Sequence, residues 1–272
     1  MLVRFTIATW ICVSSIIAWL LWPEPEADKR SLRLGSTTST QDSGLLDYLL
    51  PIYELETGVQ VLVIAKGTGA VIRDGLAGQV DALLVHNRKL EDNLVDQGYA
   101  LNRLPIMSNN FLIVGSSEFR GYENLAGLLR VLASGQRGLF LSRGDNSGTH
   151  AAEIEMWSSF NYDPHNFSDW YSKTGTGMGQ TLITANSNRS ATLVDSATWA
   201  RHGDKDKLRI WYSGHELPND YGYLALNPNV VSGVQNELAT DFGNWLAGPT
   251  GQAAIGNYLI GDMQAFLPHK TP

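Results

Sequence analysis

The sequence has almost no cysteine. Its one cysteine, Cys12, lies within an uncharged apolar run from Phe5 to Trp22. A domain that follows this run contains no disulfide, so its stability must come from a hydrophobic core. Because Cys12 lies inside the run rather than after it, the sequence also argues against lipid attachment. Of the 272 residues, 43% are hydrophobic, which is ample for one large domain or two smaller lobes.

Positive charge is also scarce. The chain has 20 Lys and Arg against 27 Asp and Glu, for a formal net charge of −7. Residues 1–30 contribute nothing to this value, because their cations and carboxylates balance: Arg4, Lys29 and Arg30 against Glu24, Glu26 and Asp28. Nucleic-acid binding needs clustered Lys and Arg to neutralise phosphates. The sequence contains no basic run, so we expect no nucleic-acid partner.

Motifs for metals and nucleotides are missing as well. The six histidines are scattered, no His-Glu-x-x-His occurs, and we expect most of them to be surface or capping residues. Residues 174–180 contain Gly-x-Gly-x-Gly rather than the dinucleotide spacing Gly-x-Gly-x-x-Gly, and there is no Gly-Lys-Ser/Thr phosphate loop. The sequence therefore predicts no metal, no cofactor and no catalytic residue.

The N-terminal run from Phe5 to Trp22 follows a single cation, Arg4. This pattern is typical of an export signal or an uncleaved anchor. We interpret residues 1–30 as a signal peptide or N-terminal membrane anchor plus a short linker, with cleavage near Ala27 as one alternative. Both interpretations predict a periplasmic or extracytoplasmic domain, which stays tethered if the hydrophobic segment is retained.

The rest of the chain alternates between short apolar runs and helical patterns. Residues 59–65 and 80–85 are expected to be strands covered on both faces, and residues 43–58 a helix that bends or restarts at Pro51. Further strands are expected at 109–115, 138–142, 208–212 and 221–228. This alternation predicts an α/β fold with mainly parallel sheets and helices on both sides.

The length favours two α/β lobes, each of roughly a hundred residues, over one very wide sheet. We expect lobe 1 at residues 31–114 and 218–272, and lobe 2 at residues 115–217. The chain would then cross between the lobes near residues 113–118 and 213–222. A ligand cleft between the lobes is the expected place for a binding site.

Three loops share a composition of Gly, Ser and Thr: residues 35–44, 66–70 and 142–149. Each follows an apolar strand and precedes a helix, so hydroxyls and bare N–H groups lie where a helix N-terminus carries partial positive charge. Taken singly, such residues are ordinary N-caps, worth about 1 kcal/mol each. Three such loops, with Arg143 in one of them, favour an anion site at the carboxyl ends of the strands. The candidate ligand-binding residues are Thr37, Thr38, Ser39, Thr68, Arg143, Ser147, Gly148 and Thr149.

The segment from Gly144 to Gly148 also looks like the surroundings of a serine nucleophile. His150 lies at helical spacing from Ser147, which leaves a secreted serine hydrolase using Ser147 as a distant alternative. The Gly-x-Ser-x-Gly elbow is absent, since Asp145 stands where its first Gly would be. We therefore expect a binding protein rather than an enzyme.

From about Leu32 onward, the chain resembles the tungstate-binding proteins of bacterial ABC importers. The resemblance rests on "STTSTQDSGLLDYLLPIYELETG", "VIAKGTG", "DALLVH", "SRGDNSGTH" and "TGTGMGQTL". It implies a two-lobed periplasmic-binding-protein-like fold that closes on a tetrahedral oxyanion, with tungstate in first place. The family's ligand motifs map onto Ser36 to Ser39, Gly67 to Gly69 and Ser142 to Thr149. The sequence departs from the family around Asp195, so the resemblance assigns that segment no role.

The resemblance also implies a partner and an assembly state: an ABC permease in the membrane and a monomeric receptor. Fixed dipoles and one arginine suit a tetrahedral oxyanion but do not define its size. Molybdate, sulfate and phosphate therefore stay open as ligands. A membrane-anchored anion sensor of the same fold is a further alternative, motivated by the N-terminal run.

Overall fold

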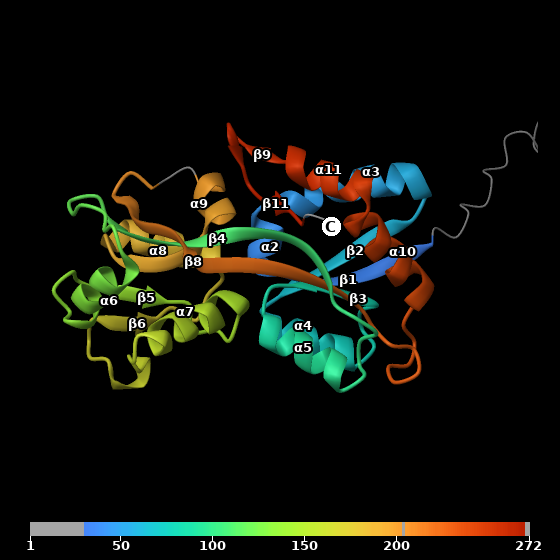
Figure 1. Ribbon diagram of the computed structural model, residues 1–272, viewed down its shortest axis with the longest axis horizontal. Helices are drawn as coiled ribbons and strands as arrows, with labels where there is room; N and C mark the ends of the chain where they lie inside the picture. Colours follow the sequence, from blue (N-terminus) through green and yellow to red (C-terminus); the bar gives the residue numbers. More distant parts are fainter. Residues whose placement is uncertain (1–29, 203–204, 270–272) are drawn as a thin grey trace, which may run out of the picture. The chain divides into compact units, whose positions relative to one another are not determined.

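A computed structural model describes residues 30–202 and 205–269. Its main element is a nine-stranded sheet with the order β2-β1-β3-β8-β4-β7-β5-β6, to which β11 adds beside β4 (Figure 1). The strands are β1 (Ser31–Thr37), β2 (Gln60–Lys66), β3 (Ala82–Val85), β4 (Leu104–Ser116), β5 (Phe140–Ser142), β6 (Tyr171–Lys173), β7 (Ala191–Asp195), β8 (Leu208–Ala225) and β11 (Leu267–Pro268). Two short strands, β9 (Leu259–Ile260) and β10 (Met263–Gln264), form a separate ribbon.

Parallel pairing dominates the two ends of the sheet, as the alternation of strands and helices predicts. β1 pairs in parallel with β2 and β3, and β5 pairs in parallel with β6 and β7. The centre is antiparallel, because β8 pairs with β3 and β4, and β4 also pairs with β7. The fold is therefore a mixed α/β sheet in which the long strands β4 and β8 connect two parallel halves.

One expectation about the strands was wrong. Residues 208–212 and 221–228 were expected to be two strands with a crossing segment between them, but β8 runs through from Leu208 to Ala225. Its hydrogen-bonded pairing with β4 continues across that segment, and the register shifts at three places where the ladder is irregular. A single sheet therefore results where two separate sheets were expected.

The helices cover both faces of this sheet (Figure 1). They are α2 (Thr38–Asp42), α3 (Leu45–Thr57), α4 (Thr68–Leu76), α5 (Arg88–Asp96), α6 (Leu125–Ala133), α7 (Gly148–Ser159), α8 (Met178–Asn188), α9 (Ser196–Arg201), α10 (Asn236–Ala247) and α11 (Pro249–Asn257), with a 3-10 turn, η1 (Pro164–Asn166). Helix α3 continues through Pro51 as one helix, and this proline lies on its exposed face.

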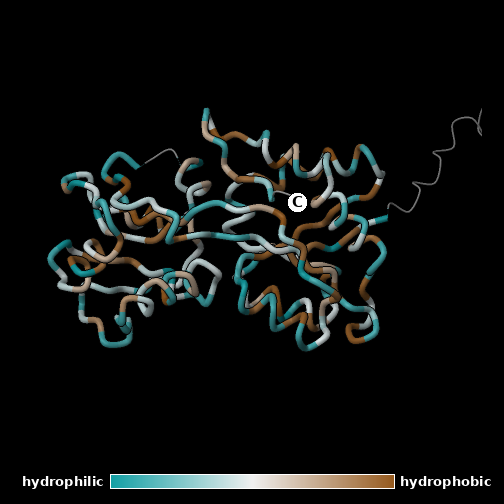
Figure 2. Tube along the Cα trace, viewed as in Figure 1, coloured by the Kyte–Doolittle hydropathy of each residue, from teal (hydrophilic) through white to brown (hydrophobic). Residues whose placement is uncertain are grey.

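The core consists of four apolar clusters that follow the two faces of the two parallel halves. Around β1–β3, one cluster lies under α3, α10 and α11, and another lies under α4 and α5. Around β5–β7, α6 and α7 cover one cluster and α8 covers the other. Figure 2 shows the hydrophobic stretch around β3 between its two helix layers. Along β4 the packing partners change between Met107 and Phe111.

Strand β2 is less buried than its apolar sequence predicts. It was expected to be covered on both faces, but it forms the edge of the sheet, and Leu62 is 44% exposed. An edge strand has a neighbour on one side only, so its apolar side chains are partly accessible. In contrast, all four residues of β3 are buried, as expected.

None of the helices within the described residues is long and apolar enough to cross a membrane. The predicted signal or anchor from Phe5 to Trp22 lies outside those residues.

Candidate anion-binding site

Arg143 is the charged group of the candidate site. It follows β5 directly and is 2% exposed. Its Nη1 donates to Thr149 Oγ1 at 3.2 Å, and its Nη2 donates to Thr38 Oγ1 at 3.4 Å. Thr38 lies 105 positions earlier in the chain, at the start of α2. The guanidinium therefore joins two of the three loops that the sequence singled out.

Asp145 is the counter-ion of this arginine. Its Oδ2 accepts from Arg143 Nη2 at 2.6 Å, and its Oδ1 accepts from the backbone N–H of Ser147 at 3.2 Å. The carboxylate thus orients the guanidinium and holds the loop before α7 at the same time. A buried guanidinium without such a partner would be costly, so Asp145 explains how the chain tolerates Arg143 in this position.

A second contact ties the loop 66–70 to the loop 142–149. The backbone N–H of Gly148 donates to Thr68 Oγ1 at 2.8 Å, and both residues are buried. Thr68 begins α4 and Gly148 begins α7. The amino ends of these two helices therefore lie against each other, with their partial positive charges on the same side.

The first loop is built differently from the sequence expectation. Residues 35–44 were expected to form a loop, but Ser36 and Thr37 end β1 and residues 38–42 form α2. Ser36 donates to the carbonyl oxygen of Leu84, so this first motif residue supports the sheet. Thr37 is the N-cap of α2, and its hydroxyl shares a 3.0 Å hydrogen bond with Ser39 Oγ.

His86 belongs to the same cluster, although the sequence analysis did not select it. Most histidines were expected to be surface or capping residues, and His86, at 7% exposed, is a buried one. Its Nε2 shares a 3.1 Å hydrogen bond with Ser39 Oγ, and its ring lies against Gly148. The sequence offered one signal for His86. This residue comes directly after the buried strand β3, and each candidate loop was also expected to begin after a strand.

The imidazole of His86 is neutral near pH 7. Its pKa is lowered from 6.5 to about 4, because burial and the positive charge of Arg143 both disfavour the imidazolium. His86 can therefore offer a hydrogen bond to a ligand without adding a second full charge next to Arg143. The ring also limits the space at Gly148, where a Cβ atom would lie 2.8 Å from Cε1.

A fourth helix end completes the cluster. Gly177, the N-cap of α8, has no side-chain hydrogen bond, and a Cβ there would lie 3.7 Å from Thr38 Oγ1. The preceding segment is attached to the arginine loop, since the N–H of Gly175 donates to the carbonyl oxygen of Arg143 at 2.8 Å. The amino ends of α2, α4, α7 and α8 thus meet around Arg143, and all eight sequence-selected residues lie at these ends or on Arg143 itself.

Ser147 has the geometry of a helix cap. Its Oγ accepts from the backbone N–H of His150 at 3.2 Å. The Nδ1 of His150 accepts from the backbone N–H of Asn146 at 3.1 Å, so this ring nitrogen is engaged away from the Ser147 hydroxyl. Among the described residues, no group of three or more His, Cys, Asp or Glu side chains is arranged to hold a metal ion.

Asp195 also has a structural role. Its Oδ1 and Oδ2 accept from the backbone and the hydroxyl of Thr198 at 2.9 and 2.5 Å, which caps α9. Burial raises the pKa of this carboxyl. Asn109 of β4 donates to the same carboxylate at 3.4 Å. Asp195 therefore links β7 and α9 to the middle of β4.

In this α/β fold the amino ends of several helices gather around one buried arginine, an arrangement that suits an anion. The family model of the PBP superfamily domain matches residues 23–250. The chain therefore belongs to the PBP superfamily.

Relatives within this superfamily carry a more specific name. The tungstate-binding protein TupA of Peptoclostridium acidaminophilum is 35% identical over 247 residues, which span 87% of this chain and 85% of that protein. A putative ABC transporter anion-binding protein of Haloferax volcanii is also 35% identical, over 90% of this chain and 73% of its own length. The crystal structure of the tungstate ABC transporter from Geobacter sulfurreducens is 41% identical, with a TM-score of 0.76, and covers 84% of this chain and 98% of its own.

Proposed function

We propose that this chain is an extracytoplasmic receptor that captures a tetrahedral oxyanion, with tungstate in first place, and delivers it to an ABC permease. The observation that carries the proposal is that four helix amino ends gather at Arg143. Those of α2 and α7 contact its buried side chain, α8 follows a segment bonded to its backbone, and α4 contacts α7. Tungstate-binding relatives that match most of the chain support this choice of ligand. We infer no covalent step, so the chain would act by binding alone and not as an enzyme.

The proposed ligand contacts are Thr37, Thr38, Ser39, Thr68, Arg143, Ser147, Gly148 and Thr149, with His86 added. Arg143 supplies a planar fork of donors that suits two oxygens of an oxyanion. The hydroxyls and helix N–H groups supply fixed dipoles, which act strongly because the surrounding groups are buried. Asp145 offsets part of the positive charge, so the site would hold a dianion mainly by hydrogen bonds.

We further propose that the site closes as two lobes move on β4 and β8. The change of packing partners between Met107 and Phe111 on β4, and between Leu217 and Tyr221 on β8, supports hinges in these segments. The first lobe boundary would then lie a few residues before the one expected at 114, and the second would fall at the one expected at 218. Hinge closure around a ligand is a common mode of motion in two-lobed receptors.

Molybdate, sulfate and phosphate are the competing ligands. Phosphate carries a proton near pH 7 and needs an acceptor, and the nearest carboxylate, Asp145, already accepts from Arg143 and Ser147. This arrangement favours a fully ionised oxyanion over phosphate.

The same proposal includes a monomer that the N-terminal segment tethers to the membrane and that acts as a receptor or as an anion sensor. The mass of the mature N-terminus tests whether this segment is retained.

The test is a thermal-shift and calorimetry series on the full-length chain with tungstate, molybdate, sulfate, phosphate and chromate. A true ligand raises the melting temperature with its occupancy. Arg143→Ala should weaken tungstate binding by at least about tenfold, because a desolvated ion loses its charged partner. The control is Arg209→Ala, which removes an exposed arginine of β8. A flat response to all five anions would overturn the proposal.

A further inference from the structure

A second polar cavity lies among α5, β4, β8 and β11. Two adjoining spaces of about 510 and 740 Å³ share four lining residues, Arg88, Arg103, Pro105 and His269. None of the nine residues proposed for the oxyanion lines either space. These volumes fall in the range of small-molecule sites.

Arg103 is the best-defined donor in this cavity. Its side chain is 9% exposed, and its Nε donates to Oε2 of the fully buried Glu91 at 2.6 Å. The other carboxylate oxygen of Glu91 accepts from the backbone N–H of Asn87 at 2.6 Å. Among the described residues, Nη2 of Arg103 is buried and has no hydrogen-bond partner. Leaving a charged donor unpaired is unfavourable, and because this nitrogen is also buried, a ligand gains that energy by accepting from it once a neighbouring side chain moves aside.

The chain makes room for this ion pair. Gly222 of β8 lies against it, and a Cβ at Gly222 would lie 2.3 Å from Glu91 Oε2 and 2.8 Å from Arg103 Nε. The Glu91–Arg103 pair is thus held between α5 and β8, with one edge of the guanidinium occupied by Glu91. A guanidinium held at one edge presents the other edge in a fixed direction, which suits one carboxylate group.

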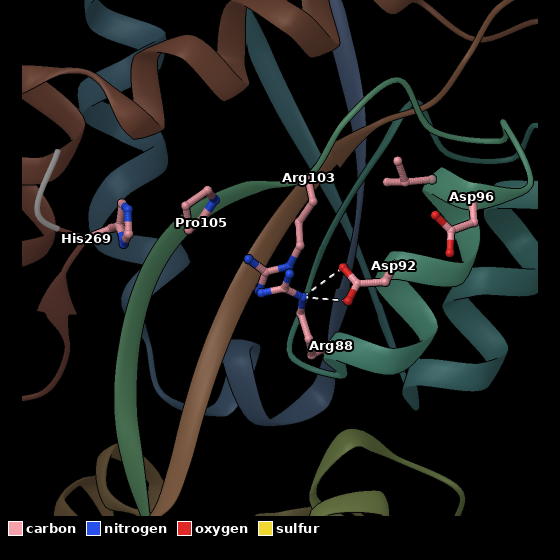
Figure 3. A pocket seen from close by; sticks show the side chains of 7 residues that line it. Arg88, Asp92, Asp96, Arg103, Pro105 and His269 are labelled. Atoms are coloured by element: carbon pink, nitrogen blue, oxygen red, sulfur yellow. Dashed lines mark hydrogen bonds and ion pairs between the residues drawn. The ribbon is translucent and has the colours of Figure 1, made fainter. Parts of the chain in front are cut away.

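The remaining charges of the cavity have both signs. Arg88 is a second cation whose Nε donates to both oxygens of Asp92 at 2.7 Å, and its side chain extends toward Arg103 in Figure 3. Asp96 and Asp220 add two further carboxylates to the lining. A multiply charged anion such as phosphate would be repelled by these carboxylates. A ligand with one carboxylate and one ammonium group would match both signs.

The walls also contain apolar groups, among them Val95, Met107 and Leu267. Arg88, whose side chain is 68% exposed, is the part of the wall that can move to admit a ligand. We propose that this cavity is a second ligand site for a small zwitterion with an apolar body, the chemistry of a free aliphatic α-amino acid. Its carboxylate binds Arg103, and its ammonium group faces Asp220.

The test is calorimetric titration of the full-length chain with leucine, with saturating tungstate present so that the first site is occupied. The comparison ligands are 4-methylpentanoate, which lacks the ammonium group, leucinamide, which lacks the carboxylate, and inorganic phosphate. We expect leucine to bind about tenfold more tightly than either truncated compound, since each loses one charged contact. The proposal is overturned if leucine gives no saturable heat, or if phosphate binds this second site as tightly as leucine does. Because leucine can be titrated without tungstate too, failure of the oxyanion proposal would be separately visible.

Two variants separate binding from folding. Arg103→Lys keeps a cation opposite Glu91 but removes the planar fork, so we expect a folded chain with about tenfold weaker leucine binding. Asp220→Asn changes an exposed carboxylate and should weaken leucine several-fold without weakening 4-methylpentanoate. The control is Asp169→Asn, an exposed carboxylate that does not line the cavity. Equal leucine affinity in Asp220→Asn and the control would contradict the proposed ammonium contact.

Discussion

The backbone N–H of Gly148 donates a 2.8 Å hydrogen bond to the hydroxyl of Thr68, which lies 80 positions earlier in the chain. This contact is shorter than the 3.4 Å hydrogen bond between Arg143 Nη2 and Thr38 Oγ1, which joins the same loop 142–149 to the start of α2. Hydrogen bonds weaken as they lengthen toward 3.5 Å, so the Thr68 contact has the more favourable distance of the two. It also leaves the amino ends of α4 and α7 in fixed relative positions.

Removing the Thr68 hydroxyl should therefore weaken oxyanion binding. In Thr68→Ala, the buried N–H of Gly148 loses its acceptor, and we expect about tenfold lower tungstate affinity, equivalent to about 1.4 kcal/mol. Thr68→Ser keeps the hydroxyl and should stay close to the unmodified chain. Calorimetric titration measures both, with Thr184→Ala as a control, because the Thr184 hydroxyl bonds only within α8, to the carbonyl oxygen of Gln180. Equal losses in the Ala and Ser variants would exclude the hydroxyl as the cause.

The sequence predicted that the three loops lie at one end of the sheet, but it did not predict the contacts between them. Residues 66–70 and 142–149 follow apolar runs, and the carboxyl ends of parallel strands meet at one edge of a sheet, so a shared location could be inferred. The contact between Arg143 and Thr38 could not be inferred, since it depends on how β4 and β8 bring distant segments together. His86 was missed because a single histidine after a strand has no distinctive pattern of its own.

The ligand-free chain should lose stability in acid through His86. The folded-state pKa of about 4 lies below the ordinary value of 6.5, so the unfolded chain binds more protons between these values. The stabilising contribution is complete above pH 6.5 and is lost as the pH falls through 4, with a magnitude on the order of 3 kcal/mol. His86→Gln, which does not titrate, should lack this component. Urea unfolding at several pH values measures it, and parallel pH profiles for the two chains would contradict the assignment.

Glu153 should act in the opposite direction. Burial raises its pKa from 4.5 to about 7, although Tyr171 donates a 2.6 Å hydrogen bond to its Oε1. The folded chain therefore binds more protons between these values, and its stability falls as the pH rises through 7, by an amount on the order of 3 kcal/mol. Glu153→Gln keeps an acceptor for Tyr171 and never ionises, so it should be more stable than the unmodified chain at pH 8. Glu155→Gln, on the exposed face of the same helix, is the control and should leave the pH profile unchanged.

Gly148→Ala should disrupt the candidate site through His86. The added Cβ would lie 2.8, 3.0 and 3.1 Å from Cε1, Nδ1 and Nε2 of a buried ring that has little freedom to move. We expect a loss of about 1–3 kcal/mol in stability, as for other overpacked positions, together with weaker tungstate binding. Gly75→Ala in α4 is the control, because its Cβ would meet Leu226 at an ordinary 3.4 Å.

A double-mutant cycle identifies the group that causes this loss. In a His86→Ala background the ring is gone, so Gly148→Ala should destabilise the chain much less than it does alone, and the two changes should couple by at least about 0.5 kcal/mol. Unfolding free energies of the four chains, measured without ligand, give that coupling directly. Additive effects would mean that the alanine at position 148 acts through the amino end of α7 instead of through His86. In that case the ring of His86 would not set the space available at Gly148.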